Sequence, residues 1–192
     1  MGALTLVWPL SYGRSLAQAP ASDHRMPGHG SMMSGYQDRA YLSAMIAHHQ
    51  AAVDMAREVL NSGRDEQVKK WAEEIIKAQE SEIGEMNGWL AALGGEDAEA
   101  AGMMRQAMQG MMAAPFASDP DRNFVGLMID HHAGAVDMAV QAVVKSDDER
   151  IVGLSRGIIN AQLDEITAFR KWLREQSQTA LMKMRKTREV LR

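Results

Sequence analysis

The chain contains the same segment twice, and this duplication restricts the folds that it can adopt. Residues 41–60 read YLSAMIAHHQAAVDMAREVL and residues 124–143 read FVGLMIDHHAGAVDMAVQAV, which aligns His48 with His131 at an offset of 83 residues (131 minus 48). The same offset aligns residues 71–90 with residues 154–173, each ending in Trp-Leu. Because one offset relates two segments in each copy, the repeated unit is a pair of helices.

Helix start and stop signals divide each copy into two helices. Asp65 is a favourable N-cap, Pro120 is tolerated in a first turn, and Gly94-Gly95 is typical of a helix end. The turn within each copy is short, so its two helices are antiparallel neighbours. The predicted helices cover about 35–60, 65–93, 119–145 and 147–175.

The copies are joined by a connection long enough to run the length of a bundle, as the long crossover of ferritin-like folds does. We therefore predict an all-α, ferritin-like four-helix bundle made of two antiparallel helix hairpins. Part of the crossover, from Asp97 to Met112, can itself be helical. The predicted divisions are repeat one at 35–93, the crossover at 94–118 and repeat two at 119–175.

Three further segments lie outside the predicted bundle. Residues 1–19 contain the apolar run LTLVWPL and the small-x-small pattern Ala17-Gln18-Ala19, which indicate a signal segment and a periplasmic or secreted protein. Residues 20–34 form a tail rich in His and Met that we expect to be flexible. Residues 176–192 carry five basic side chains against Glu189 alone, and we interpret them as a solvated helical extension.

Composition excludes several classes of function. A net charge of -4 argues against nucleic acid as a main partner, because neutralising phosphates needs a basic face. No run approaches the roughly 18 apolar residues of a membrane span. The chain has no cysteine, which rules out disulfides and thiolate chemistry, but it has 16 methionines. Thioethers are soft ligands that select Cu(I) over hard cations.

The repeated His-His pair lies on the apolar stripe of its helix. At 100° per residue His49 falls in the middle of that stripe, and His48 at its flank with Met45 and Met55 nearby. The second copy reproduces the pattern with Met128, His131, His132 and Met138.

The partner helix of each hairpin carries a carboxylate on its own apolar stripe. Glu82 and Glu165 follow Gln79 and Gln162 by about one turn. Counting back from the turn places each carboxylate within about one turn of its His pair. A carboxylate there needs a partner, because burying it unpaired is costly. We therefore expect imidazole, carboxylate and thioether groups to converge twice in the interior.

This mixed donor set predicts a metal site. Imidazole with thioether favours copper, as Cu(I) or Cu(II), whereas zinc, the alternative, has no need of methionine. A diiron site is not expected, because the chain lacks the Glu-x-x-His motifs of such bundles. The candidate ligands are Met45, His48, His49, Met55, Glu82, Met128, His131, His132, Met138 and Glu165 in the bundle, and His24, Met26 and His29 in the tail.

Other interpretations remain open from the residues alone. The buried His and Glu side chains can form a satisfied polar network that fixes helix register without any ligand. A metal-dependent oxidoreductase would need an open coordination position, and no substrate pocket is signalled, so we do not expect an enzyme. The crossover methionines, residues 103, 104, 108, 111 and 112, either bind metal or form a stripe that covers the bundle.

The segments MIAHHQAAVDMA and MIDHHAGAVDMA, each followed by an Ala-Gln…Glu-Ile…Trp-Leu helix, resemble the domain of unknown function 305 family over about residues 36–175. The resemblance implies a ferritin-like bundle, export, copper binding and a part in copper resistance. It would place copper ligands at Met45, His48, His49, Met55 and their equivalents Met128, His131, His132, Met138. The implied partners are a metal ion and a copper exporter or another copper-handling protein.

Overall fold

The computed structural model describes residues 36–190, and within that range it contains helices and no strand. The predicted all-helical bundle is therefore confirmed. The predicted signal segment and the His/Met-rich tail lie outside the described residues. None of the described helices combines the length and the apolar character needed to cross a membrane.

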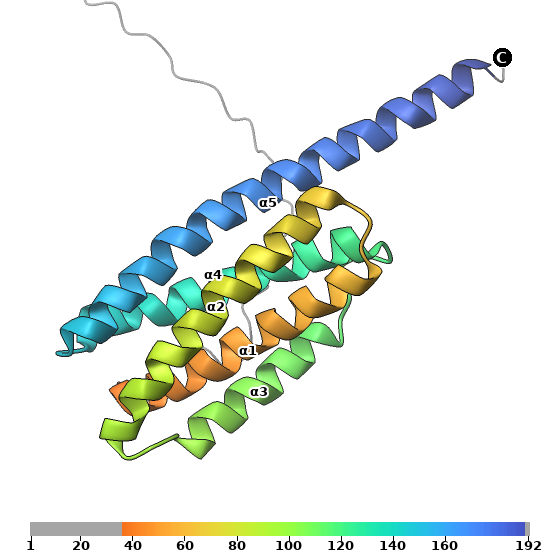
Figure 1. Cartoon of the computed structure of the whole chain (residues 1–192). Helices are drawn as coiled ribbons and strands as arrows, with labels where there is room; N and C mark the ends of the chain where they lie inside the picture. Colours follow the sequence, from red (N-terminus) through yellow and green to blue (C-terminus); the bar gives the residue numbers. More distant parts are fainter. Residues whose placement is uncertain (1–35, 191–192) are drawn as a thin grey trace, which may run out of the picture.

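The bundle consists of two antiparallel hairpins and one further helix (Figure 1). Helices α1 and α2 form the first hairpin, and α4 and α5 form the second. The crossover between them contains the short 3-10 helix η1 and the helix α3, which packs on α1. The bounds are Asp38–Ser62 for α1, Glu66–Leu90 for α2, Ala91–Leu93 for η1, Ala98–Met112 for α3, Pro120–Lys145 for α4 and Glu149–Val190 for α5.

Aspartate side chains begin three of these helices. The Asp65 carboxylate accepts from the backbone N–H groups of residues 67 and 68, Asp97 from Ala100 N and Asp119 from Arg122 N. Each bond satisfies a backbone donor that has no partner within the helix. Pro120 occupies the first turn of α4, as the sequence predicts.

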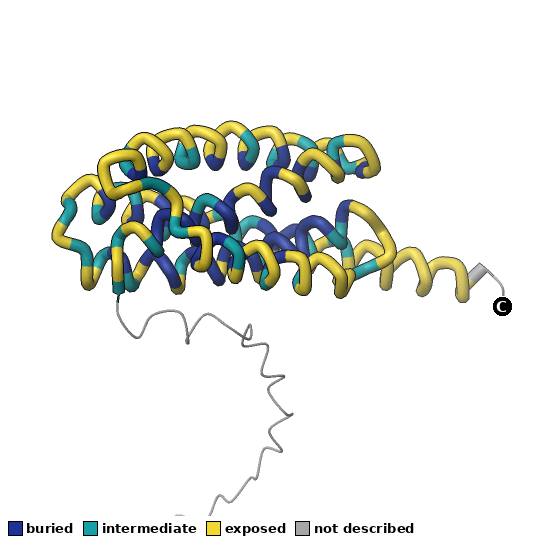
Figure 2. The backbone as a smooth tube through the Cα atoms, turned by 90° about the horizontal axis from the view of Figure 1, so that it is seen from below, coloured by how far each residue is buried: buried dark blue, intermediate teal, exposed yellow. Residues whose placement is uncertain are grey.

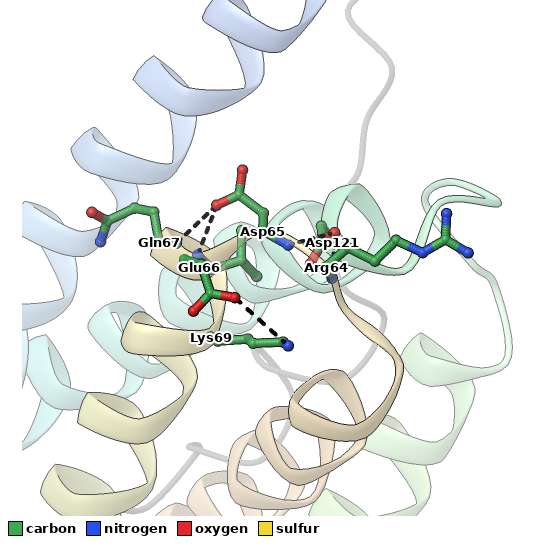
Figure 3. A network of polar contacts seen from close by, with 7 residues as sticks. Arg64, Asp65, Glu66, Gln67, Lys69 and Asp121 are labelled. Carbon is green, nitrogen blue, oxygen red and sulfur yellow. Dashed lines mark hydrogen bonds and ion pairs between the residues drawn. The ribbon is translucent and has the colours of Figure 1, made fainter.

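The turn between α1 and α2 is tied to the start of α4. Asp121 accepts hydrogen bonds from the backbone N–H groups of Arg64 and Asp65 at 3.0–3.2 Å, and Asp65 in turn begins α2 (Figure 3). Gly63 lies so close to this carboxylate that a Cβ there would be 2.5 Å from Asp121 Oδ1. A residue of the second hairpin thus fixes the turn of the first.

The core divides into two clusters that occupy opposite ends of the bundle. Figure 2 shows that the buried residues of the helices are turned toward the inside of the bundle. The first cluster joins the first half of α1 to the second half of α2, α3, the second half of α4 and the start of α5. It contains five buried methionines, at positions 45, 86, 104, 108 and 138. The second cluster joins the other halves and contains two, at 55 and 128, together with Phe124, Phe169 and Trp172.

The crossover methionines show why α3 packs where it does. Met104 and Met108 are buried on the side of α3 that joins the first cluster, whereas Met103 and Met112 are exposed. The stripe interpretation therefore accounts for the buried pair. Helix α5 runs through the predicted boundary at residue 175 and projects beyond the bundle, with exposed Leu181, Met182 and Met184 on the projecting part (Figure 1).

Candidate metal centre

All four histidines of the two repeated pairs are completely buried, each with 0% of its surface exposed. His48 and His49 lie in the middle of α1, and His131 and His132 lie in the middle of α4. Histidine is usually only partly buried, so four such rings in one small core need polar or metal partners. The predicted inward orientation of both pairs is what the structure shows.

The second histidine of each pair contacts the predicted carboxylate of its own hairpin. His49 Nε2 lies 2.8 Å from Glu82 Oε2, in a hydrogen bond between α1 and α2. His132 Nε2 lies 2.7 Å from Glu165 Oε2, between α4 and α5, although the angles there are not those of a hydrogen bond. We call these the His49–Glu82 pair and the His132–Glu165 pair. Glu82 is the less exposed carboxylate, at 19% against 31% for Glu165.

The first histidine of each pair meets its equivalent from the other repeat. The ring centroids of His48 and His131 are 3.7 Å apart, with the planes tilted by 39°. His131 Nε2 donates a hydrogen bond of 2.8 Å to the carbonyl oxygen of His48, because a carbonyl oxygen can only accept. Equivalent positions of the duplicated sequence therefore face each other at the contact between α1 and α4.

The four predicted methionines are all buried, but they do not gather at one point. Met45 and Met138 belong to the first core cluster, and Met55 and Met128 belong to the second. Each end of the bundle therefore receives one methionine from α1 and one from α4. The predicted tail ligands, His24, Met26 and His29, lie outside the residues that the structure describes.

The donor atoms fit a soft or borderline metal. His49 Nδ1 and His132 Nδ1 are buried and have no hydrogen-bond partner within residues 36–190, so each is a nitrogen that a metal could use. Buried thioethers lie in both core clusters, at each end of the bundle. Over the described range, no group of three or more His, Asp or Glu side chains is placed so that it could hold a metal ion.

Two buried residues near Glu82, Met86 and Tyr41, were not predicted from the sequence as ligands or partners. Met86 is fully buried one turn after Glu82 on α2, and only its spacing of four residues could have marked it. Tyr41 forms a 2.7 Å hydrogen bond with Ser155 of α5. Burial raises the pKa of the Tyr41 phenol to about 12, and the nearby Glu82 charge adds to the rise.

Comparison with known proteins identifies relatives over most of the bundle. The family model described as Domain of unknown function (DUF305) matches residues 38–173 and again residues 121–190, so the second match begins in α4. A curated relative, "Uncharacterized protein L153" of Acanthamoeba polyphaga mimivirus, is 42% identical over 53 residues, which are 28% of this chain. The match spans about a third (35%) of that relative's length.

Solved structures share the fold. CopM in the Cu(I)-bound form is 30% identical with a TM-score of 0.61, and the match covers 73% of this chain and 98% of CopM. CopM has also been solved in Cu(II)-bound and Ag-bound forms. A DUF305 protein of Streptomyces coelicolor, described as a candidate secreted protein, is 26% identical with a TM-score of 0.62, over 73% of this chain and 93% of that one.

Proposed function

This chain belongs to the DUF305 family, and from that membership and its buried histidines we propose that it binds copper outside the cytoplasm and holds it or passes it on. The proposed ligands come from the His49–Glu82 and His132–Glu165 pairs, from His48 and His131, and from the buried methionines of each end. We propose a binding protein and not an enzyme. Zinc is the alternative metal.

The observation that carries this proposal is the complete burial of four imidazoles in a core that also contains buried thioethers. Packing alone is served better by an apolar side chain, because a buried polar ring must recover the hydrogen bonds that it loses to water. Nitrogen and sulfur donors together match the preference of Cu(I) and Cu(II). The likeness to CopM, solved with Cu(I), Cu(II) and Ag, supports the same class of metal.

Export is part of the proposal and rests on separate observations. The apolar run and the Ala17-Gln18-Ala19 pattern near the start of the chain are typical of a secretory signal. The likeness to a DUF305 protein described as a candidate secreted protein agrees with it. The expected partners are the metal ion and a copper exporter or another copper-handling protein.

Competition titration with Cu(I) tests the proposal. The unaltered protein should bind Cu(I) with a submicromolar Kd, and a variant with His48, His49, His131 and His132 all replaced by alanine should not. Because four such changes can unfold the core, a second variant replaces Met45, Met55, Met128 and Met138 by leucine, which conserves volume. Equal Cu(I) binding by the unaltered protein and this folded variant, or none by the unaltered protein, would contradict the proposal.

A second candidate function is a structural bundle in which the His–Glu pairs only fix the helices. The 2.8 Å bond between His49 and Glu82 favours it, because that imidazole nitrogen is already satisfied. Thermal unfolding separates the two. A metal that binds only the folded state stabilises it by about 2.7 kcal/mol at a free concentration of 100 Kd, which raises Tm by roughly 5–10 °C. An unchanged Tm with copper would favour the structural role.

A further inference from the structure

The two His–Glu pairs occupy equivalent positions in the duplicated sequence but differ in their surroundings. Moving by 83 residues relates Met45 to Met128 and Met55 to Met138, so each end has the same two methionines from α1 and α4. The same step relates Met86 of α2 to Phe169 of α5. The third position, one turn beyond the carboxylate, therefore holds a thioether in one repeat and a phenyl ring in the other.

Phe169 shows where this third position lies. Its ring centroid is 5.6 Å from that of His132, and it also packs edge-on against Trp71 at 5.0 Å. Phe169 is completely buried, so it fills the space beside the imidazole of the His132–Glu165 pair. A phenyl ring has no lone pair to give a metal, so this position adds no ligand in the second repeat.

Met86 occupies the equivalent place in the first repeat. It is completely buried, lies one turn after Glu82 on the same face of α2, and shares the first core cluster with Met45 and Met138. The internal symmetry therefore relates the position of Met86 beside the His49–Glu82 pair to that of Phe169 beside the His132–Glu165 pair. The long, flexible side chain of methionine can turn its sulfur toward a ligand without moving the backbone.

Helix α3 increases this difference. It adds Met104 and Met108, both buried, to the first cluster, and it packs on α1. The first core cluster is thus richer in sulfur than the second, with five buried methionines against two. Soft ligands raise the preference of a site for Cu(I) and Ag(I) over harder cations.

We propose that the two metal sites are unequal, and that Met86 is the residue that makes them so. The site at the His49–Glu82 pair takes a soft monovalent ion, Cu(I) or Ag(I), with Met86 as an additional thioether donor. The site at the His132–Glu165 pair, where Phe169 replaces that donor, binds the same ion more weakly. This inference rests on the proposed copper binding and deepens it.

Ag(I) titration of the full chain tests this, using a competing chelator for affinity and methionine methyl NMR signals to locate the ion. The unaltered protein should show two affinities, and the Met86 methyl signal should shift in the tighter step. Met86→Leu conserves volume and should weaken the tighter site by at least about ten-fold, since even the loss of a group behind a ligand costs 10–100-fold. Phe169→Met should strengthen the weaker site, and Phe169→Leu is the matched control without a sulfur.

The outcomes separate this inference from the proposal beneath it. If the unaltered protein binds neither Ag(I) nor Cu(I), the proposed function fails and the inference fails with it. If it binds Ag(I) but Met86→Leu leaves both affinities unchanged and the Met86 signal does not shift, copper binding stands and the inequality through Met86 is overturned. Circular dichroism confirms that each variant is folded before titration.

Discussion

At the end of the bundle where α1 begins, Tyr41 is hydrogen-bonded to Ser155, whereas the equivalent residues at the opposite end are Phe124 and Ala72. Both pairs are buried, and neither leaves its polar groups without a partner. Tyr41 and Ser155 are hydrogen-bonded to each other, whereas Phe124 and Ala72 are both apolar. A buried polar side chain is therefore tolerated when its hydrogen-bonding partner is buried with it. The His–Glu pairs are retained in both repeats, while the groups around them differ.

The two hairpins also differ in how their second helices end. After α2, Gly94 and Gly95 adopt φ values of +90° and +86°, which turn the chain so that α3 returns to α1. The equivalent residues of α5 are Ser177 and Gln178, and the helix continues to Val190. Two glycines thus decide whether the chain covers the first cluster with more methionines or projects as a basic helix.

The largest expected effect concerns the turns. Gly63 of the first hairpin corresponds to Ser146 of the second. Gly63→Ala should cost about 3 kcal/mol of unfolding free energy, because its Cβ would meet the backbone oxygen of Val59 at 2.7 Å and disturb the Asp121 hydrogen bonds. Ser146→Ala loses the 3.1 Å bond from Asp148 N and the side-chain contact with Tyr36, and it should cost about 1 kcal/mol. Urea unfolding measures both, and equal costs would show that the turns are equivalent after all.

The next effect depends on pH. The pKa of Tyr41 is raised from 10.0 to about 12 in the folded protein, so the neutral phenol stabilises the fold fully below pH 10, and this contribution is lost as the pH rises to 12. Two pKa units correspond to about 2 to 3 kcal/mol. Unfolding free energies at pH 8 to 11 should therefore fall more steeply for the unaltered protein than for Tyr41→Phe. Parallel curves for the two proteins would contradict this. Burial also raises the pKa of Tyr36, but both proteins contain Tyr36, so it does not affect the comparison.

The smallest effect compares the carboxylates in metal-free protein. Glu82→Ala leaves His49 Nε2 buried without its hydrogen bond and should cost about 2 kcal/mol. Glu165→Ala should cost about 1 kcal/mol, because Glu165 is more exposed and the contact lacks hydrogen-bond angles. Chemical denaturation with a chelator present measures the difference. A larger cost at Glu165 would reverse the inferred order of the two pairs.

Much of this fold could be predicted from the chain alone. The duplication gives two hairpins, and the capping residues Asp65 and Asp119 place the starts of α2 and α4. The stripe positions of His49 and Glu82 predicted their contact, because both lie within one hairpin whose turn fixes the register. Such contacts follow from short turns and helical periodicity.

Contacts between the hairpins could not be predicted in this way. His48 meets His131 across 83 residues, and Asp121 reaches the turn at Arg64, yet no local pattern links these positions. The packing of α3 on α1 likewise depends on the path of the chain after Gly95. Met86 was left out of the predicted ligand set because an apolar stripe does not indicate which of its methionines differ in role from ordinary core residues.

The sequence by itself determined the duplicated helical hairpin and the inward-facing imidazole, carboxylate and thioether groups, because helical periodicity and short turns act over a few residues. Only the tertiary structure decided which groups of the two copies meet and where α3 packs. These contacts depend on how whole hairpins pack against each other, because the shape and burial of many side chains together determine that packing.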